Sequence, residues 1–355
     1  MKSSSLELLK SLLDSPGPSG FEAEPARIWR TEAESFADSV EVDVGGNCIA
    51  AINPDADSRV MFAGHVDEIG IMVSHVDDKG FIYFSTIGGW DHQVFVGQRV
   101  VISTRKGQVR GVIGKKPIHL IKSDDRDTGS KVTDLWIDIG SRTKNETLKR
   151  IRIGDPGVLA STALDFPHGR LVSRSIDNRI GAFVVLEALR LLAARRPASA
   201  VFAVATAREE IAWTGGGAKT SAAGIDPSVA IVVDVTHATD HPNLESKEHG
   251  DVKLGKGPVL SRGSSVSSVV FEMLAGVAEA QKIPYQTAAA PTDTGTDADA
   301  IHTTLRGVPT GLISIPNRYM HSPNEMVELA DVDKAAKLLA AFARKVKPTT
   351  DFRPL

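Results

Sequence analysis

The chain has 355 residues, of which 42% are hydrophobic and 24% are charged. This composition is ordinary for a folded globular protein and excludes general disorder, and the length suggests about two domains. The 44 acidic and 41 basic residues leave a formal charge of −3, which gives no reason to expect a nucleic acid or a membrane as partner. Cys48 is the one cysteine, so any metal must be held by His, Asp and Glu.

The first residues predict a helix and no targeting signal. The spacing of Ser4 and Glu7 is that of a capping box at the start of this helix. Glu7 and Lys10 interrupt the apolar run that a signal peptide needs, and no segment approaches the roughly 18 apolar residues of a membrane span. We therefore expect a cytoplasmic protein. The leucines suit one face of the helix: Leu6, Leu8, Leu9, Leu12 and Leu13.

The middle of the chain, residues 71–160, has a β-rich pattern with glycine-rich turns and no long helical periodicity. We interpret this segment as a small all-β module inserted into a larger domain. Its short apolar runs with strand character cover residues 70–75, 81–85, 99–103, 109–113 and 135–139.

The two flanking parts, residues 1–70 and 161–355, have the pattern of an α/β domain. Buried strands alternate with helices there, which favours a mostly parallel sheet flanked by helices on both faces. The simplest architecture is one α/β domain interrupted by the β insertion. The expected strands are 59–63, 200–206, 229–235 and 311–315, and the expected helices are 178–194 and 329–346.

Histidines and carboxylates follow the expected strands at the point where each strand ends. Open α/β sheets bind ligands at the carboxyl ends of their strands. Each residue alone has an ordinary interpretation: a loop histidine, a helix cap, or a solvated pair of acids. Two histidines and four carboxylates at successive strand ends together fit a two-metal site better than chance. The candidates are His65, Asp177, Glu209, Glu210, Asp234 and His321, with Asp67 as a further carboxylate beside His65.

The residue types suit a hydrolytic metal centre. Two neighbouring divalent ions need a shared carboxylate and a further histidine and carboxylate each, and such ligands suit zinc, cobalt or manganese. A carboxylate outside the ligand set must take a proton from water, and the adjacent Glu209 and Glu210 can divide these two jobs. Asp67, two residues after His65, can orient its imidazole.

Six motifs occur in the order and spacing of a known family, and the resemblance runs from Gly17 almost to the C-terminus. The sequence resembles the dinuclear-metal aminopeptidases, which include glutamyl, deblocking and tetrahedral aminopeptidases and some proteins named cellulase or endoglucanase. The motifs are Gly64-His65-Val66-Asp67-Glu68-Ile69-Gly70, Ser175-Ile-Asp177-Asn-Arg179-Ile-Gly181, Glu209-Glu210-Ile, Val233-Asp234-Val-Thr, Gly295-Thr296-Asp297-Ala298 and Arg318-Tyr319-Met-His321-Ser-Pro-Asn-Glu325.

The resemblance implies a role for each candidate residue. It implies a zinc-peptidase-like catalytic domain with two divalent ions, most often zinc, and peptides as substrates. A cis peptide bond is expected between Asp177 and Asn178, and the insertion is expected to be a dimerisation domain within a dimer or a tetrahedral dodecamer. The implied roles are a bridging ligand for Asp177, ligands of one ion for His65 and Asp234, ligands of the other for Glu210 and His321, a general base for Glu209 and an orienting partner of His65 for Asp67.

Three other functions are compatible with parts of the pattern. A metal-dependent deacylase or amidohydrolase acting on small N-acyl substrates would use the same metals, because the metal site determines hydrolysis and not specificity. A glycosidase would use a carboxylate pair, and its activity would persist in the presence of a metal chelator. A metal-stabilised structural shell would have no use for Glu209.

Several other features carry no predicted role in the site. The loop 250–257 nearly matches a phosphate-binding loop but lacks the Ser or Thr after Lys256. The segment 212–217 is bulkier and richer in glycine than the family's pattern, at a place where it would shape the substrate pocket. Cys48 is expected to be a packed thiol. The histidines without a predicted metal role are His75, His92, His119, His168, His237, His241, His249 and His302.

Overall fold

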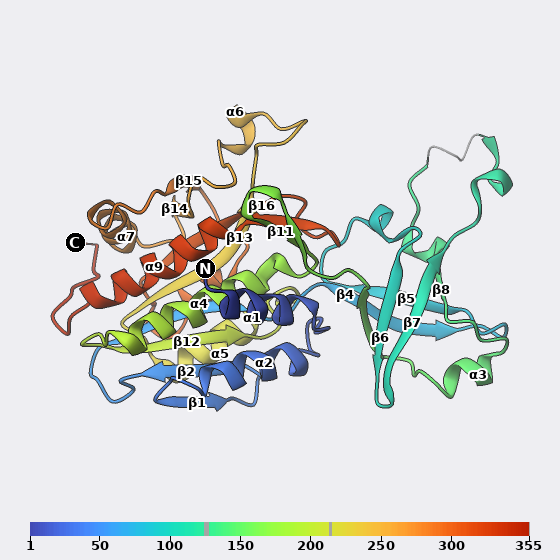
Figure 1. The fold of residues 1–355 in the computed structure, drawn as a ribbon, viewed down its shortest axis with the longest axis horizontal. Helices are drawn as coiled ribbons and strands as arrows, with labels where there is room; N and C mark the ends of the chain where they lie inside the picture. The colour runs from blue at the N-terminus through green and yellow to red at the C-terminus, as the bar shows by residue number, and fades with distance from the viewer. Residues whose placement is uncertain (124–127, 213–214, 355) are drawn as a thin grey trace.

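A twisted eight-stranded sheet forms the core of the protein (Figure 1). The computed structural model describes residues 1–123, 128–212 and 215–354. The four central strands are parallel, and both pairs at the β1 edge are antiparallel, so the sheet is mixed but rich in parallel pairs. In spatial order the strands are β1 (Ser39–Val42), β2 (Cys48–Ile52), β12 (Ala200–Thr206), β3 (Arg59–His65), β13 (Val229–His237), β16 (Thr310–Asn317), β14 (Val259–Gly263) and β15 (Gln286–Ala290).

Helices cover both faces of this sheet, and the alternation of side chains along β3 shows how. Val60 and Phe62 belong to the larger hydrophobic cluster, whereas Met61 and Ala63 belong to the cluster on the opposite face. Strands buried on both faces consist of near-continuous apolar residues, which is why these strands could be recognised in the sequence. The larger cluster includes α1 (Ser3–Asp14), α2 (Ala23–Ala33), α4 (Ile176–Ala194), α7 (Ser268–Ala280) and α9 (Leu329–Lys345), and the other includes α5 (Gly216–Ile225) and α8 (Asp297–Ile301).

The middle of the chain forms a closed antiparallel barrel, which lies to the right in Figure 1. It has its own hydrophobic cluster, which includes Ile71, Phe95 and Ile137. All five expected strand segments are present, and β9 was missed because its short run contains a proline and a glycine. The barrel order is β4 (Gly70–Val76), β5 (Ile82–Ile87), β8 (Trp136–Asp138), β7 (Gly107–Gly114), β6 (Arg99–Thr104) and β9 (Pro156–Leu159).

The fold therefore confirms the expected α/β class with a parallel-rich sheet. The division into a catalytic domain (1–70 and 161–355) and an insertion (71–160) stays a prediction, although the barrel strands span residues 70–159. A third sheet of β10 (Leu164–Phe166), β11 (Arg170–Ser173) and β17 (Glu325–Glu328) pairs Ser173 with Glu325. The remaining α-helices are α3 (Lys144–Leu148) and α6 (Ser246–His249).

One local prediction was wrong. The first helix begins at Ser3, and its N-cap residue Lys2 makes no side-chain capping bond, so Ser4 lies inside the helix and forms no capping box. The burial of Leu9, Leu12 and Leu13 is as expected, because packing against α2 and α4 decides where this helix lies. Across the described part of the chain, no helix combines the length and the apolarity needed to cross a membrane.

Candidate metal centre

The candidate site lies at the carboxyl edge of the central strands. β3 ends at His65, which is in register with Thr206, the last residue of β12. Asp234 lies on β13 two residues beyond Val232, which pairs with Ala63 of β3. Because parallel strands place their carboxyl ends at the same edge, side chains from distant parts of the chain meet there.

Asp177, at the start of α4, lies between two imidazoles. Its Oδ1 atom is 3.2 Å from Nε2 of His65, and its Oδ2 atom is 3.3 Å from Nε2 of His321. Oε2 of Glu210 is 3.4 Å from the same His321 nitrogen. On the other side, Nε2 of His65 lies 3.7 Å from Glu209 and 3.9 Å from Asp234. The geometry thus places one carboxylate oxygen of Asp177 beside each of the two imidazoles.

The types and spacings of these side chains suit divalent cations. Two ligands bound to one zinc ion at 2.0–2.1 Å in a tetrahedral shell are about 3.3 Å apart, whereas charged N–H···O hydrogen bonds are about 2.7–2.9 Å long. The separations around Asp177 match the first spacing. Oε1 of Glu210 is buried and has no hydrogen-bond partner among the described residues, which leaves a carboxylate oxygen free for a cation. Among the residues that the structure describes, two groups that share His65 have metal-binding spacing: His65, Asp177 and Glu210, and His65, Glu209 and Asp234.

The electrostatics of the cluster also favour bound cations. Burial, together with the neighbouring carboxylates of Asp234, Asp297 and Glu210, raises the pKa of Glu209 to about 10 against the opposing effect of His65. Burial likewise pushes the pKa of Asp234 well above its usual range. Acids shift in this way because negative charge accumulates where water is excluded. Positive ions at the centre would offset that accumulation.

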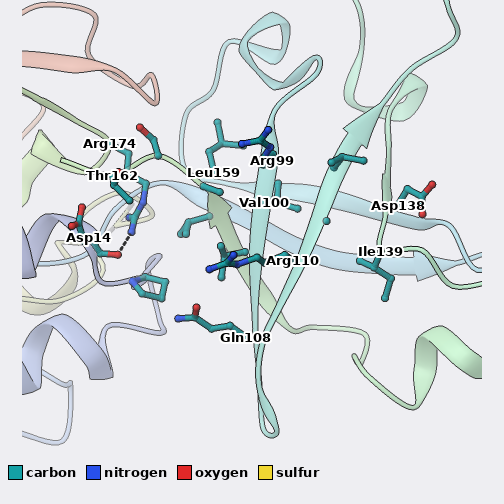
Figure 2. A pocket seen from close by; sticks show the side chains of 17 residues that line it. Asp14, Arg99, Val100, Gln108, Arg110, Asp138, Ile139, Leu159, Thr162 and Arg174 are labelled. Carbon is teal, nitrogen blue, oxygen red and sulfur yellow. Dashed lines mark hydrogen bonds between the residues drawn. The ribbon is translucent and has the colours of Figure 1, made fainter. Parts of the chain in front are cut away.

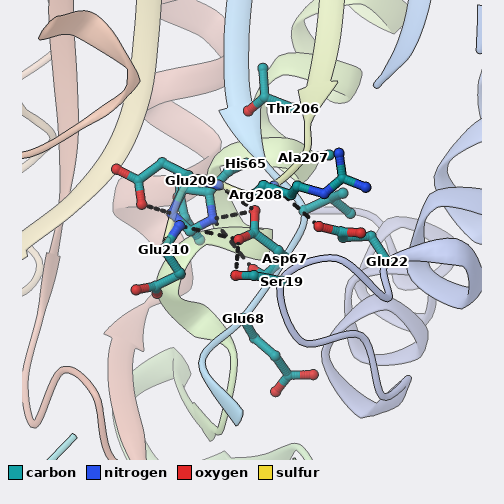
Figure 3. Close-up of polar contacts among 12 residues, drawn as sticks. Ser19, Glu22, His65, Asp67, Glu68, Thr206, Ala207, Arg208, Glu209 and Glu210 are labelled. Carbon is teal, nitrogen blue, oxygen red and sulfur yellow. Dashed lines mark hydrogen bonds and ion pairs between the residues drawn. The ribbon is translucent and has the colours of Figure 1, made fainter. Parts of the chain in front are cut away.

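Asp67 contacts His65 and the backbone of the loop that carries Glu209 and Glu210 (Figure 3). Its carboxylate accepts hydrogen bonds from the hydroxyl of Ser19 (2.5 Å) and from the backbone N–H groups of Glu209 and Glu210 (3.2 Å each). One carboxylate oxygen is also 3.4 Å from Nδ1 of His65. Asp67 therefore positions the imidazole and the loop that carries both glutamates.

Two supporting residues were missed by sequence reasoning. Glu325 is buried and accepts hydrogen bonds from the backbone N–H groups of Asp177 (3.0 Å) and His321 (2.9 Å). Ser19 is the other. Their signals were present, because Glu325 follows His321 by four residues in one quoted motif and Ser19 belongs to the glycine- and proline-rich segment that opens the resemblance. Only the fold shows what they contact.

The backbone around the centre takes uncommon conformations. The peptide bond between Asp177 and Asn178 is cis, as expected. Ser175, Arg208 and His321 have positive φ values of 57°, 62° and 58°, which non-glycine residues rarely adopt. Such residues cluster at functional sites, where the surrounding structure holds side chains in directions that a relaxed backbone would not give.

The structure shows where three sequence features without a predicted role lie: the loop 250–257, the segment 212–217 and Cys48. The backbone N–H groups of Gly255 and Gly257 donate to the carboxylate of Asp331, so this loop offers them to no phosphate. Of the segment 212–217, residues 213 and 214 lie outside the described residues, and Ala212 and Gly215 line a cavity of about 460 Å³ beside Glu209. Cys48 is a buried free thiol, as expected.

The family follows from comparison with known proteins. The model of the M42 glutamyl aminopeptidase family matches residues 46–338, and the chain belongs to this family. This confirms the resemblance seen in the motifs.

Individual relatives match over nearly the whole chain. A lysyl aminopeptidase of Pyrococcus furiosus is 35% identical over 98% of this chain and 99% of its own. The structure of a TET aminopeptidase from the marine sediment archaeon Thaumarchaeota archaeon SCGC AB-539-E09 has a TM-score of 0.92 at 36% identity, covering 97% of each chain. The Pyrococcus horikoshii TET1 peptidase, described as assembling into a tetrahedron or a large octahedral shell, has a TM-score of 0.86 at 31% identity, covering 96% of this chain and 100% of its own.

Proposed function

We propose that this protein is a metal-dependent aminopeptidase that removes N-terminal residues from peptides. The observation that carries the proposal is the position of Asp177, whose two oxygens face the imidazoles of His65 and His321. Membership of the M42 family and the similarity to aminopeptidases support a peptide substrate.

Two divalent ions, zinc in the first instance, fit the ligand atoms. Asp177 would bridge them, with His65 and Asp234 completing one site and Glu210 and His321 completing the other. When bound, the ions would lower the pKa of a coordinated water and polarise the scissile carbonyl. Cobalt and manganese accept the same ligand types.

Glu209 is assigned the proton transfers. Its carboxylate reaches the centre from the loop after β12 and would receive a proton at Oε2 and deliver it to the leaving nitrogen. Asp67 and Ser19 hold the His65 imidazole and the backbone of this loop in place. The cavity of about 460 Å³ beside Glu209 offers space for the side chain of the N-terminal residue.

We further propose that the protein is a homo-oligomer whose barrel, within residues 71–160, forms the dimer contact. The tetrahedral assembly described for the TET1 peptidase makes a dodecamer the first alternative to a dimer. Light scattering coupled to size-exclusion chromatography separates these two masses.

The test of the function is a matched substrate pair. The metal-free protein is assayed before and after addition of zinc, cobalt or manganese, with an aminoacyl p-nitroanilide and with its N-acetylated form. The aminopeptidase proposal expects metal-dependent hydrolysis of the free-amine substrate and little hydrolysis of the acetylated one. Preference for the acetylated substrate would replace the proposal with a deacylase, and chelator-resistant hydrolysis of a β-glucoside would replace it with a glycosidase.

A further inference from the structure

A second cavity lies between the barrel and the rest of the fold (Figure 2). Its volume is about 530 Å³, and it is distinct from the cavity beside Glu209. In Figure 2, Arg99 and Arg110 lie on the barrel side, and Asp14, Thr162 and Arg174 lie on the other side. We call it the cationic cavity.

The barrel wall carries two arginines, Arg99 and Arg110, that pair with no acidic side chain in the described part of the chain. In the ladder of β6 and β7, Arg99 pairs with Val112 and Val101 pairs with Arg110, so the two arginines are diagonal neighbours on one face. Neither guanidinium makes a hydrogen bond or an ion pair with a described residue. Both side chains are exposed, and an anion bound between them would offset the repulsion of the two like charges.

The opposite wall contributes a buried arginine. Arg174 is only 5% exposed, and its guanidinium pairs with Glu68 and donates to the backbone oxygen of Asp14 (2.6 Å). Its Nε atom is buried and has no hydrogen-bond partner among the described residues. Glu68 also pairs with Arg179 at 2.8 Å, so two buried guanidiniums share this one carboxylate. The wall therefore keeps excess positive charge and an unused donor.

The two acids of the lining offset this charge only in part. Oδ1 of Asp14 accepts a hydrogen bond from the backbone of Ala163, and Oδ1 of Asp138 accepts one from the backbone of Gly140 (2.7 Å each). Three arginines against two aspartates leave the lining net positive. Between the charges the surface is apolar, with Val101, Val112 and Val158 among its residues.

We propose that the cationic cavity binds a small organic anion that has one carboxylate and an apolar body. The guanidiniums of Arg99 and Arg110 recognise the carboxylate, because their planar donor pairs match its two oxygens. The valines of β6, β7 and β9 cover the apolar part. The volume fits a ligand of this class, since small-molecule sites range from about 300 to 1,000 Å³.

The test uses hexanoate as the probe on the full-length, metal-loaded protein, with calorimetric titration as the measurement. Hexanoate is expected to bind saturably, and more tightly than inorganic phosphate, which lacks the apolar body, or hexylamine, which has the wrong charge. The Arg110→Gln variant is expected to weaken hexanoate binding about tenfold or more, because a charge-assisted hydrogen bond is lost. Arg105→Gln, which removes an exposed arginine outside the cavity on the same hairpin, is the matched control and is expected to bind like the wild type.

Several outcomes would overturn the proposal. Equal hexanoate affinity in the wild type and in Arg110→Gln would remove the cavity as the site. Binding that survives in Arg110→Gln but disappears in Asp177→Asn would assign the carboxylate to the metal centre. Tighter binding of phosphate than of hexanoate would contradict the apolar recognition. A change of assembly mass in Arg110→Gln without any hexanoate binding by the wild type would make this face an interface between copies of the chain.

Discussion

The metal centre and the cationic cavity are close in the chain but opposite in electrostatics. Asp177 of the centre and Arg174 of the cavity are separated by two residues, yet one site gathers carboxylates and the other gathers guanidiniums. The centre consists of groups whose charge depends on protons and cations, whereas arginine stays charged at any ordinary pH. A net charge of −3 for the whole chain describes neither region, because burial and local partners decide the sign at each site.

The two regions also differ in how their charged groups are supported. In the centre, Asp67 and Glu325 accept hydrogen bonds from a hydroxyl and from backbone N–H groups, which hold the ligand set rigidly. In the cavity, Arg99 and Arg110 have no such support among the described residues. The first arrangement suits chemistry that needs fixed geometry, and the second leaves donors free for a ligand.

The largest effect is expected from Asp177→Asn. The amide keeps the shape of the side chain but loses the charge that both proposed metal sites share, so metal content and aminopeptidase activity should both fall below detection. Elemental analysis and the p-nitroanilide assay measure this. Asp165→Asn is the control, since that exposed acid pairs with Lys10 and is not one of the candidate residues of the centre, and it should leave both quantities unchanged. An Asp177→Asn protein that folds and keeps normal metal content would contradict the bridging role.

The next effect is expected from Glu209→Gln. This change removes the proposed proton acceptor and leaves the other ligands, so turnover should fall by about a hundred- to ten-thousand-fold while the metal content stays near that of the wild type. Parallel measurements of kcat and bound metal separate the two properties. Normal turnover in this variant would show that Glu209 is not the general base.

A smaller effect is expected from Ser19→Ala, which removes the hydroxyl that donates to Asp67. Partners behind the ligands of a metal site typically contribute about ten- to a hundred-fold in metal affinity or activity. Ser19→Thr keeps a hydroxyl and should recover much of the loss. Ser15→Ala is the matched control, because Ser15 is also buried but donates to the backbone of Leu12. Equal loss of metal affinity in both alanine variants would reduce Ser19 to a folding role.

The smallest effect is expected in the pH dependence of metal binding. Burial lowers the pKa of His321, but its hydrogen bonds to Asp177 and Glu210 raise it more, to about 11. In the metal-free protein this imidazole is therefore protonated at pH 7, and a metal takes only the neutral form. Metal binding should release protons, and metal affinity should rise about tenfold per pH unit for each proton released.

Calorimetry in buffers of different ionisation enthalpy measures that release. Hexanoate binding to the cationic cavity should release none between pH 6 and pH 8, because arginine and a carboxylate both keep their charge there. Metal binding without proton release, or hexanoate binding with it, would remove the proposed contrast between the two regions.

Much of the fold could be predicted from local sequence patterns. The strands β3, β12, β13 and β16 were predicted because strands buried on both faces are continuous apolar runs. All seven candidate residues of the site follow or lie within such runs, or begin a helix, and the fold brings them to one edge of the sheet. Their roles as ligands and base remain proposals. The edge strands β1 and β15 and their neighbours β2 and β14 were not predicted, since short strands depend on pairing with distant segments.

The sequence alone was enough to predict the family and the α/β fold class, which the comparisons and the structure bear out, and to propose the histidines and acids of a sulfur-free metal centre. The folded chain was needed to show that Asp177 faces two imidazoles, that Ser19 and Glu325 support the centre, and that Arg99, Arg110 and Arg174 meet across one cavity. The physical reason is the distance along the chain over which each kind of information acts. Periodicity and residue type report on a few neighbouring positions, whereas strand register and loop conformation decide which atoms of distant segments come within bonding distance.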